Sequence, residues 1–418
     1  MLYSPKDRDA LSAEKPGFAE FVVVVALIMA IGAFSIDNIM PAFGPIHQEF
    51  GVASSNDMQL MMTVYMASFA VMQLVYGPIS DAIGRRPTLM IGMGVYLLGS
   101  VAAVFAPSFE LLLAARALQG LGAACTRVIS VALVRDRYAG REMARVMSLT
   151  MMIFIIVPIF APAVGSLILH ASNWRFIFLS MVLMALLVVG WFGLRMPETL
   201  RPQYRRPVSL AMLSNGFTRS MTTRVCIGYS TCMGMMMGCV MSYVNSAQQI
   251  FETEVYGLGP WFPLAFGSIA AVMGLASFVN SSLVGRVGMR RMAHGATIGF
   301  ILVALIQFVV AKAYGGAPPL LAFGATLAGC HFLFSLIMPN SNAMAMEPVG
   351  DIAGTASSFM GFYTTLAGAL LGYLVGQHFN GTVIPLTIGY LAFGCGTLLV
   401  MLWAEKGRLF QPHNPPTR

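Results

Sequence analysis

The strongest constraint on this chain is a series of twelve apolar segments, each long enough to cross a bilayer. A helix needs about 20 consecutive apolar residues to span the hydrocarbon core. The segments lie at roughly 19–42, 57–79, 88–106, 110–134, 144–168, 175–195, 224–246, 258–283, 292–313, 318–340, 352–379 and 382–404. Lipid offers no hydrogen bonds to a backbone, so such segments must be helical. The sequence therefore predicts an all-α membrane protein with twelve transmembrane helices.

The composition excludes several other classes. Only 10% of the 418 residues are charged, whereas a soluble domain carries about 25%. The net charge of +8 would suit a nucleic-acid partner, but the basic residues lie in short loops, where they orient a membrane protein, so we expect no nucleic-acid binding. The six cysteines fall inside apolar segments without the spacing of a metal site, so we expect no metal and no disulfide framework. The first apolar segment is too long for a signal peptide.

One connection is much longer than the others and divides the segments six and six. It is rich in Arg, Pro and Ser and has a modest amphipathic patch near Leu210–Leu213. We therefore expect two pseudo-symmetric six-helix bundles. The expected parts are a cytoplasmic tail (1–18), a first bundle (19–196), a cytoplasmic linker (197–223), a second bundle (224–404) and a second cytoplasmic tail (405–418).

The basic residues also predict an orientation. With the N-terminus in the cytoplasm, nearly all of the 25 lysines and arginines lie on the cytoplasmic side. Only Arg175 and Lys312 fall on the other side, and Arg116 and Arg127 fall within a segment. Because cytoplasmic loops collect Lys and Arg, we expect both termini inside.

A dense polar stretch, Gly77–Pro87, separates the second and third segments, and we expect it to be a short turn at the cytoplasmic surface. Its functional candidates are Gly77, Asp81, Gly84, Arg85 and Arg86. Glycine permits close helix approach and tight turns, an aspartate can face a helix N-terminus, and arginines pair with carboxylates or helix C-terminal carbonyls. The alternative is a generic basic loop. A second copy, at 288–291, lacks the aspartate and is a weak match.

Asp37 is the only acid well inside a segment, in its outer half. A charged side chain at the middle of a membrane helix costs about 2.5–3.5 kcal/mol. Burial favours the neutral carboxyl, so a proton is the natural partner of Asp37. The alternative is an interfacial aspartate that caps the outer end of the segment, since Pro41 and Pro45 follow and would break the helix.

Arg116 and Arg127 lie eleven residues apart in the fourth segment, which is about three helical turns and nearly one face. Two permanent cations must face a cavity or a partner, not lipid. The alternatives are a structural ion pair near the inner surface for Arg116, and a similar pair for Arg127 with an outer-half partner such as Asp37. Two cations against one acid predict a neutral-to-positive cavity and anionic or zwitterionic substrates.

The remaining candidates are milder. Pro158, Pro162 and Gly165 in the fifth segment allow either a static kink or a helix that flexes during alternating access. Residues with a possible cavity-lining role are Gln119, Tyr243, Asn245, His331, Asn340 and Tyr363. Each is also compatible with a helix–helix hydrogen bond, and the histidine could titrate or be a satisfied core residue.

These motifs resemble those of one family. The Gly77–Pro87 stretch resembles the loop 2–3 signature of the major facilitator superfamily, and Arg116-x-x-Gln-Gly120 resembles the motif of its proton-driven exporters. Ala161-Pro-x-x-Gly165 is similar to the antiporter motif, with Ala where many members have Gly. Asp37-x-x-x-Pro41 and the stretch 347–357 are similar to the bicyclomycin-resistance branch of drug:proton antiporters.

The resemblance implies two helical bundles around a cavity that opens alternately to each side. Asp37 would be the acid that responds to proton and substrate, and Arg116 would aid proton coupling. Asp81 would contact the start of the eleventh segment, near 353–358, and lock the inner gate, while Arg85 would join a charge network with Asp136. Arg127 lies outside the general motif.

We therefore expect a proton-coupled secondary transporter of the bacterial inner membrane that exports small amphipathic molecules or drugs. It would need no cofactor beyond the proton gradient, would contact substrate, protons and lipid, and would act as a monomer. One alternative is a dedicated exporter of an anionic or zwitterionic metabolite or metal chelator. A membrane-embedded enzyme or receptor is the other, but the sequence has only isolated ionisable groups at membrane depth and no phosphate-binding loop.

Overall fold

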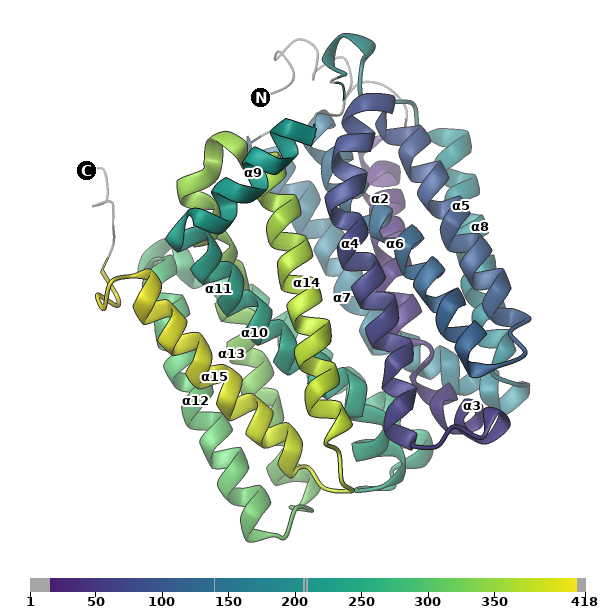
Figure 1. Ribbon diagram of the computed structural model, residues 1–418, viewed down its shortest axis with the longest axis vertical. Helices are drawn as coiled ribbons and strands as arrows, with labels where there is room; N and C mark the ends of the chain where they lie inside the picture. Colours follow the sequence, from purple (N-terminus) through teal and green to yellow (C-terminus); the bar gives the residue numbers. More distant parts are fainter. Residues whose placement is uncertain (1–15, 139, 206, 208–209, 412–418) are drawn as a thin grey trace. The chain divides into compact units, whose positions relative to one another are not determined.

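The structure is a computed structural model that describes residues 16–138, 140–205, 207 and 210–411. The described residues form helices, turns and loops and contain no strand (Figure 1). The chain divides into two compact units, Met1–Ala211 and Met212–Arg418. Each unit is built around its own set of six long helices.

The long helices of the first unit are α2 (Phe18–Asp37), α4 (Leu60–Ile83), α5 (Arg85–Val104), α6 (Phe109–Arg137), α7 (Gly140–Ala171) and α8 (Arg175–Arg195). Between α2 and α4 lie the short elements η1 (Met40–Ala42), α3 (Phe43–Phe50) and η2 (Ser55–Gln59), and η3 (Pro202–Tyr204) follows α8.

The long helices of the second unit are α10 (Arg224–Ala247), α11 (Phe262–Val287), α12 (Met289–Ala313), α13 (Leu320–Met346), α14 (Ala353–Gln377) and α15 (Ile384–Ala404). A π-helical turn, η4 (Gln248–Thr253), continues α10, and the 3-10 turns η5 (Gly259–Trp261) and η6 (Glu347–Ile352) precede α11 and α14.

Ten segments of the described chain are long and apolar enough to cross a membrane. One of them, Leu320–Gln377, contains both α13 and α14, and α7 contributes a shorter apolar stretch, Ile156–Ala171, in addition to the ten. Counting α7 and separating α13 from α14 gives twelve long apolar helices in the described chain. The prediction of an all-α membrane protein with two six-helix bundles is therefore confirmed.

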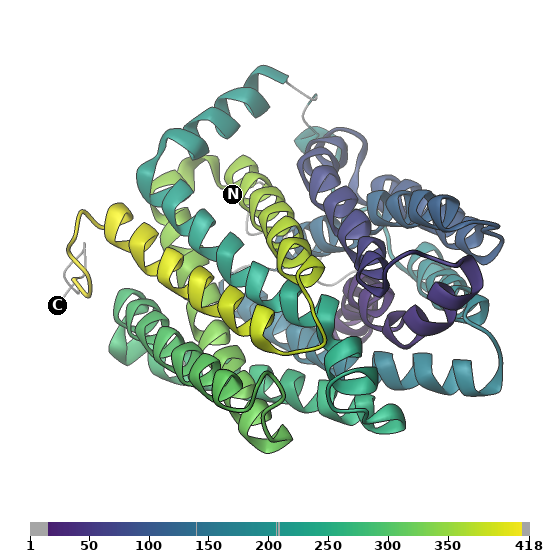
Figure 2. The ribbon, with the colours of Figure 1, turned by 60° about the horizontal axis from the view of Figure 1, so that its bottom comes forward.

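The two units repeat one packing scheme. In the first, the main neighbours are α5 with α6, α4 with α6, α2 with α7, α5 with α8, and α2 with both α6 and α8. In the second they are α12 with α13, α11 with α13, α10 with α14, α12 with α15, and α10 with both α13 and α15 (Figures 1 and 2). Numbered by order within each unit, the two sets of pairs are the same. The two units are therefore repeats of one six-helix packing scheme.

The local structure differs from the expectation in three places. The stretch Gly77–Pro87 is not a loop: α4 continues through Pro78 to Ile83 and α5 begins at Arg85, so only Gly84 makes the turn. The first span ends at Asp37 rather than at residue 42, because η1 and α3 turn the chain away. The long connection contains a helix, α9 (Leu210–Thr222), which is longer than the expected amphipathic patch.

The helix α9 packs on the start of α14 within the second unit. The Phe217 ring meets the Phe359 ring edge-on at 4.9 Å, and Arg219 forms an ion pair with Asp351. These contacts hold α9 against the start of α14.

Candidate functional site

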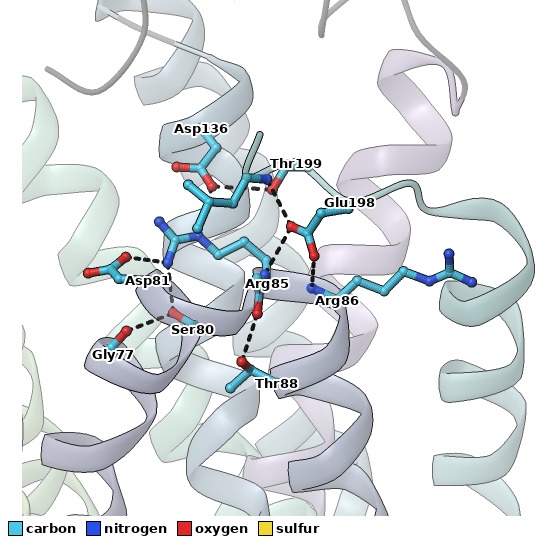
Figure 3. A network of polar contacts seen from close by, with 11 residues as sticks. Gly77, Ser80, Asp81, Arg85, Arg86, Thr88, Asp136, Glu198 and Thr199 are labelled. Carbon is cyan, nitrogen blue, oxygen red and sulfur yellow. Dashed lines mark hydrogen bonds and ion pairs between the residues drawn. The ribbon is translucent and has the colours of Figure 1, made fainter. Parts of the chain in front are cut away.

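The turn between α4 and α5 is made by Gly84, which has φ +114° and ψ 161°. Its missing side chain leaves room for the Glu198 carboxylate, which an added Cβ would approach to 2.4 Å. Glu198 accepts hydrogen bonds from the backbone N–H groups of Arg85 (2.9 Å) and Arg86 (3.1 Å). These are free donors at the N-terminus of α5, where a negative charge is favoured. Glu198 therefore caps α5 from the segment that follows α8 (Figure 3).

The Arg85 side chain lies between two carboxylates. Its Nε donates to Asp136 Oδ2 at 2.8 Å, and its Nη1 donates to Asp81 Oδ1 at 2.5 Å and to Ser80 Oγ at 2.7 Å. Arg85 and Asp136 are each 1% exposed, whereas Asp81 is 43% exposed. Thr199 Oγ1 also donates to Asp136 Oδ2, at 3.2 Å (Figure 3). The structure thus brings Asp81, Arg85 and Asp136 together at one end of the first unit.

Arg86 and Gly77, the neighbouring candidates, make other contacts. Arg86 Nη2 donates to the carbonyl oxygen of Gly193, near the C-terminus of α8, at 2.5 Å, which is the pairing expected for a guanidinium near carbonyls of a helix end. Gly77 lies inside α4, and its carbonyl accepts a hydrogen bond from Ser80 Oγ at 2.9 Å. The sequence reasoning missed Glu198 and Thr199. The signal that could have identified Glu198 is its position: it is an isolated acid directly after the sixth span, on the side where the arginines are concentrated.

Asp37 is the last residue of α2 and is 6% exposed. No described side chain forms a hydrogen bond or ion pair with its carboxylate. The end of α2 is closed instead by the N–H of Asn38, which donates to the carbonyl of Phe34 at 3.0 Å. The expected alternative, a capping aspartate, is therefore not what the structure shows. A helix C-terminus carries partial negative charge, so this position disfavours an ionised carboxylate.

Arg116 is completely buried inside the first unit. Its Nε donates to the carbonyl of Met61 at 3.2 Å, its Nη1 donates to Gln119 Oε1 at 2.5 Å, and its guanidinium lies 4.4 Å from the centre of the Tyr65 ring. Gln119 in turn donates to Ser100 Oγ at 2.8 Å. All these partners are neutral, so the guanidinium is held by hydrogen bonds and a cation–π contact.

The alternative for Arg116, a structural ion pair near the inner surface, was wrong in its partner and in its position. No acid among the described residues pairs with it. Met61 is at the start of α4, whereas Asp81 is near the end of α4, so Arg116 lies at the end of the unit opposite to the Gly84 turn.

Arg127 differs from Arg116 because its side chain is exposed. The helices α2 and α6 run antiparallel, with the Arg137 guanidinium 5.0 Å from the Phe21 ring and an added Cβ on Gly32 3.6 Å from Thr126 Oγ1. This register places the last residue of α2 level with position 121 of α6, about 9 Å along the axis from Arg127. The suggested ion pair between Asp37 and Arg127 is not formed.

The residues of the fifth span bear on the same region. Pro158 and Pro162 lie within α7 without ending it. Gly165 lies against the backbone of Asn38, and an added Cβ would be 2.2 Å from its carbonyl oxygen. The glycine therefore allows α7 to touch the residue that follows Asp37.

In the second unit, two candidates form helix–helix hydrogen bonds. Asn340 Nδ2 on α13 donates to Asn280 Oδ1 on α11 at 2.7 Å, and the hydroxyls of Tyr363 on α14 and Thr231 on α10 are 3.1 Å apart. His331, Tyr243 and Asn245 are buried. No side chain among the described residues pairs with Oδ1 of Asn245.

The weak second copy of the turn has a charge network that the sequence reasoning missed. Gly288 has φ +89°, as Gly84 has a positive φ, and Arg290 pairs with Glu347 and Glu405, both at 3.0 Å. Glu405 also accepts a hydrogen bond from the Tyr229 hydroxyl at 2.7 Å. The absent aspartate is thus replaced by acids that follow α13 and α15. The described residues contain no cluster of His, Cys, Asp and Glu able to hold a metal ion.

Comparison with known proteins identifies the family. The model of the Major Facilitator Superfamily matches residues 25–372. The chain belongs to this superfamily. It is therefore a membrane transporter rather than an enzyme.

Relatives and solved structures agree with this assignment. A bicyclomycin resistance protein homolog of Haemophilus influenzae is 27% identical, covering 88% of this chain and 91% of that protein. The multidrug resistance protein D of Escherichia coli is 26% identical, covering 91% and 94%. A solved structure of the E. coli xylose transporter XylE, at 12% identity, superposes with a TM-score of 0.72, and the match covers 93% of this chain and 98% of that one. The low identity to XylE supports the fold alone.

Proposed function

We propose that this transporter exports small amphipathic molecules, including drugs, across the bacterial inner membrane in exchange for protons. It would act as a monomer with both termini in the cytoplasm and with the bundle, linker and tail boundaries expected from the sequence. Two relatives whose names state bicyclomycin or multidrug resistance support this class of substrate.

The observation that carries the proposal is that the Asp37 carboxyl is buried without a partner among the described side chains. A buried carboxyl without a hydrogen-bonding or ionic partner among the described residues, at the negative end of a helix, is more stable protonated than ionised. Ionisation becomes favourable when water or a substrate donor reaches it. A proton from outside and a substrate would therefore compete for this position.

The antiporter helix gives this site a mechanical connection. Gly165 lies against the backbone of Asn38, so a backbone movement at the end of α2 would displace α7 directly. Pro158 and Pro162 remove backbone hydrogen bonds from the same helix and lower its resistance to bending. We propose that α7 flexes when Asp37 exchanges its proton.

The network at the other end of the unit would form the cytoplasmic gate. The buried pair of Arg85 and Asp136 would hold the turn rigid, while the half-exposed Asp81 would contact residues 353–358 in the outward-open state. Gly84 and Arg86 would set the geometry of the turn through Glu198 and the end of α8.

The arginines bear on substrate charge. Arg116 is occupied by neutral partners, whereas Arg127 is exposed and no acid among the described residues pairs with it. An exposed cation at membrane depth is expected to interact with solute or water. This favours anionic or zwitterionic cargo and keeps the second candidate function open: a dedicated exporter of an anionic or zwitterionic metabolite or metal chelator.

A susceptibility panel tests the proposal. Cells that express the transporter would be compared with cells that express the Asp37→Asn variant, each with and without an uncoupler, for anionic, zwitterionic and cationic compounds. We expect resistance that the uncoupler and the variant both abolish, strongest for anionic or zwitterionic compounds. Preference for bulky cations would refute the charge argument, and resistance that survives the uncoupler would refute proton exchange.

A further inference from the structure

The His331 imidazole on α13 has a fixed tautomer. Its Nδ1 lies 3.0 Å from the carbonyl oxygen of Leu327, four residues earlier in the same helix. A carbonyl oxygen can only accept a hydrogen bond, so Nδ1 must carry the proton of the neutral ring. Nε2 is therefore left with a bare lone pair.

This lone pair is buried and unsatisfied. His331 is 2% exposed, and no hydrogen-bond partner for Nε2 exists among the described residues. Its nearest ring neighbours are Tyr243 on α10, with ring centroids 4.9 Å apart, and Tyr390 on α15, with centroids 6.0 Å apart. The fully buried Tyr390 hydroxyl also has no partner among the described residues.

The groups around the ring carry no charge that would repel a cation formed by protonation. The titratable groups on the packed elements are the hydroxyls of Tyr243 and Tyr390 and the thiols of Cys239 and Cys330, which interact with Tyr390. All are neutral near pH 7. No acid or base among the described residues pairs with the imidazole. Aromatic rings within about 6 Å attract a cation through their faces.

We propose that Nε2 of His331 is a second proton-binding site, in the second unit of the transporter. The proton adds to the Nε2 lone pair, no other covalent bond changes, and the Nδ1–H bond to Leu327 is kept in both states. The resulting charge is shared by the two N–H groups of a ring that packs against the two tyrosine rings. The inference rests on the proposed proton-coupled function, since it adds a second proton to that cycle.

The chain contains a matched control for this histidine. His378, near the end of α14, has the same bond, with Nδ1 2.8 Å from the carbonyl oxygen of Leu374. Its side chain is exposed. The two residues therefore share a tautomer and differ in whether water reaches Nε2.

The first test uses nitrogen-15 NMR of histidine-labelled transporter in lipid nanodiscs, from about pH 5 to about pH 9. The variants His331→Gln and His378→Gln assign the two signals. We expect both rings to be the Nδ1–H tautomer at high pH and both to become imidazolium as the pH falls, at different midpoints. A His331 signal that stays neutral over the whole range, or that shows the other tautomer, would overturn the proposal.

The second test measures proton coupling in proteoliposomes with a substrate found in the susceptibility panel. If His331 contributes one transported proton, His331→Gln lowers the accumulation ratio by about tenfold for each unit of pH difference. Unchanged accumulation would overturn its role, as would equal losses in His331→Gln and His378→Gln. Absence of proton-driven uptake by the wild-type transporter would instead refute the proposed function, and the NMR titration would still decide whether His331 binds a proton.

Discussion

The turn between α4 and α5 gives the sharpest quantitative prediction, which concerns the change Asp136→Asn. Arg85 and Asp136 are both 1% exposed and are joined at 2.8 Å. Removing one partner of a buried ion pair leaves an uncompensated charge and costs about 3–5 kcal/mol. Because Asp81 still faces the guanidinium from the other side, we expect the lower end of that range, about 3 kcal/mol.

The same network supplies a graded series of controls. Asp81→Asn removes a partner that is 43% exposed, and solvent screening limits such a loss to about 1 kcal/mol or less. Thr199→Val removes a neutral hydrogen bond to Asp136 of 3.2 Å, for which we expect about 1 kcal/mol. The expected order of destabilisation places Asp136→Asn well above both.

Thermal unfolding of the purified transporter in detergent measures this order. For a unit of this size a loss of 3 kcal/mol corresponds to a fall in Tm of about 6–12 °C. The three variants and the double variant at Asp81 and Asp136 would be compared under one set of conditions. An Asp136→Asn protein no less stable than Asp81→Asn would refute the account of the network, since it would mean that the buried pair contributes nothing beyond a surface one.

Three further predictions address other parts of the molecule. Gly165→Ala places a methyl group against a backbone carbonyl of the α2 end, and we expect a cost of about 1–3 kcal/mol by thermal unfolding and slower transport. The control Gly190→Ala, with nothing within 4 Å of the added atom, should not destabilise the protein and should leave transport unchanged. Glu405→Gln breaks the buried ion pair with Arg290 and weakens the hydrogen bond from Tyr229. We expect the free energy of unfolding to fall by about 3 kcal/mol, and an unchanged Tm would contradict the role given to the Arg290 network. Arg127→Ala should change the free energy of unfolding by no more than about 0.5 kcal/mol, because the side chain is exposed. The variant should export anionic compounds less well than the wild type, and equal export would remove Arg127 from the substrate path.

The sequence was sufficient for the helices because their signal is local. Apolar length and basic loops depend on the residues themselves, so α8, for example, was predicted with its bounds of 175 and 195. The ends next to glycine and proline were harder. Pro78 was taken as part of a turn, but a helix in a membrane can retain a proline when its neighbours satisfy the freed carbonyl.

Partners far apart in the chain were not predictable from the sequence. Glu198 reaches the α5 N-terminus across more than a hundred residues, and Glu347 and Glu405 meet at Arg290 from two different helices. No spacing rule links such residues. The partner of Arg116 was misjudged for a related reason: a cation that finds carbonyls, an amide and an aromatic ring needs no acid, so charge counting alone predicted a wrong partner.

We propose that Asp37 exchanges a proton during each export cycle, and one experiment tests this role directly. Wild-type and Asp37→Asn transporters would be reconstituted in proteoliposomes and measured both for counterflow, which needs no proton exchange, and for uptake driven by a pH gradient. We expect the variant to retain counterflow and to lose gradient-driven uptake. Gradient-driven uptake that persists in Asp37→Asn would contradict this role.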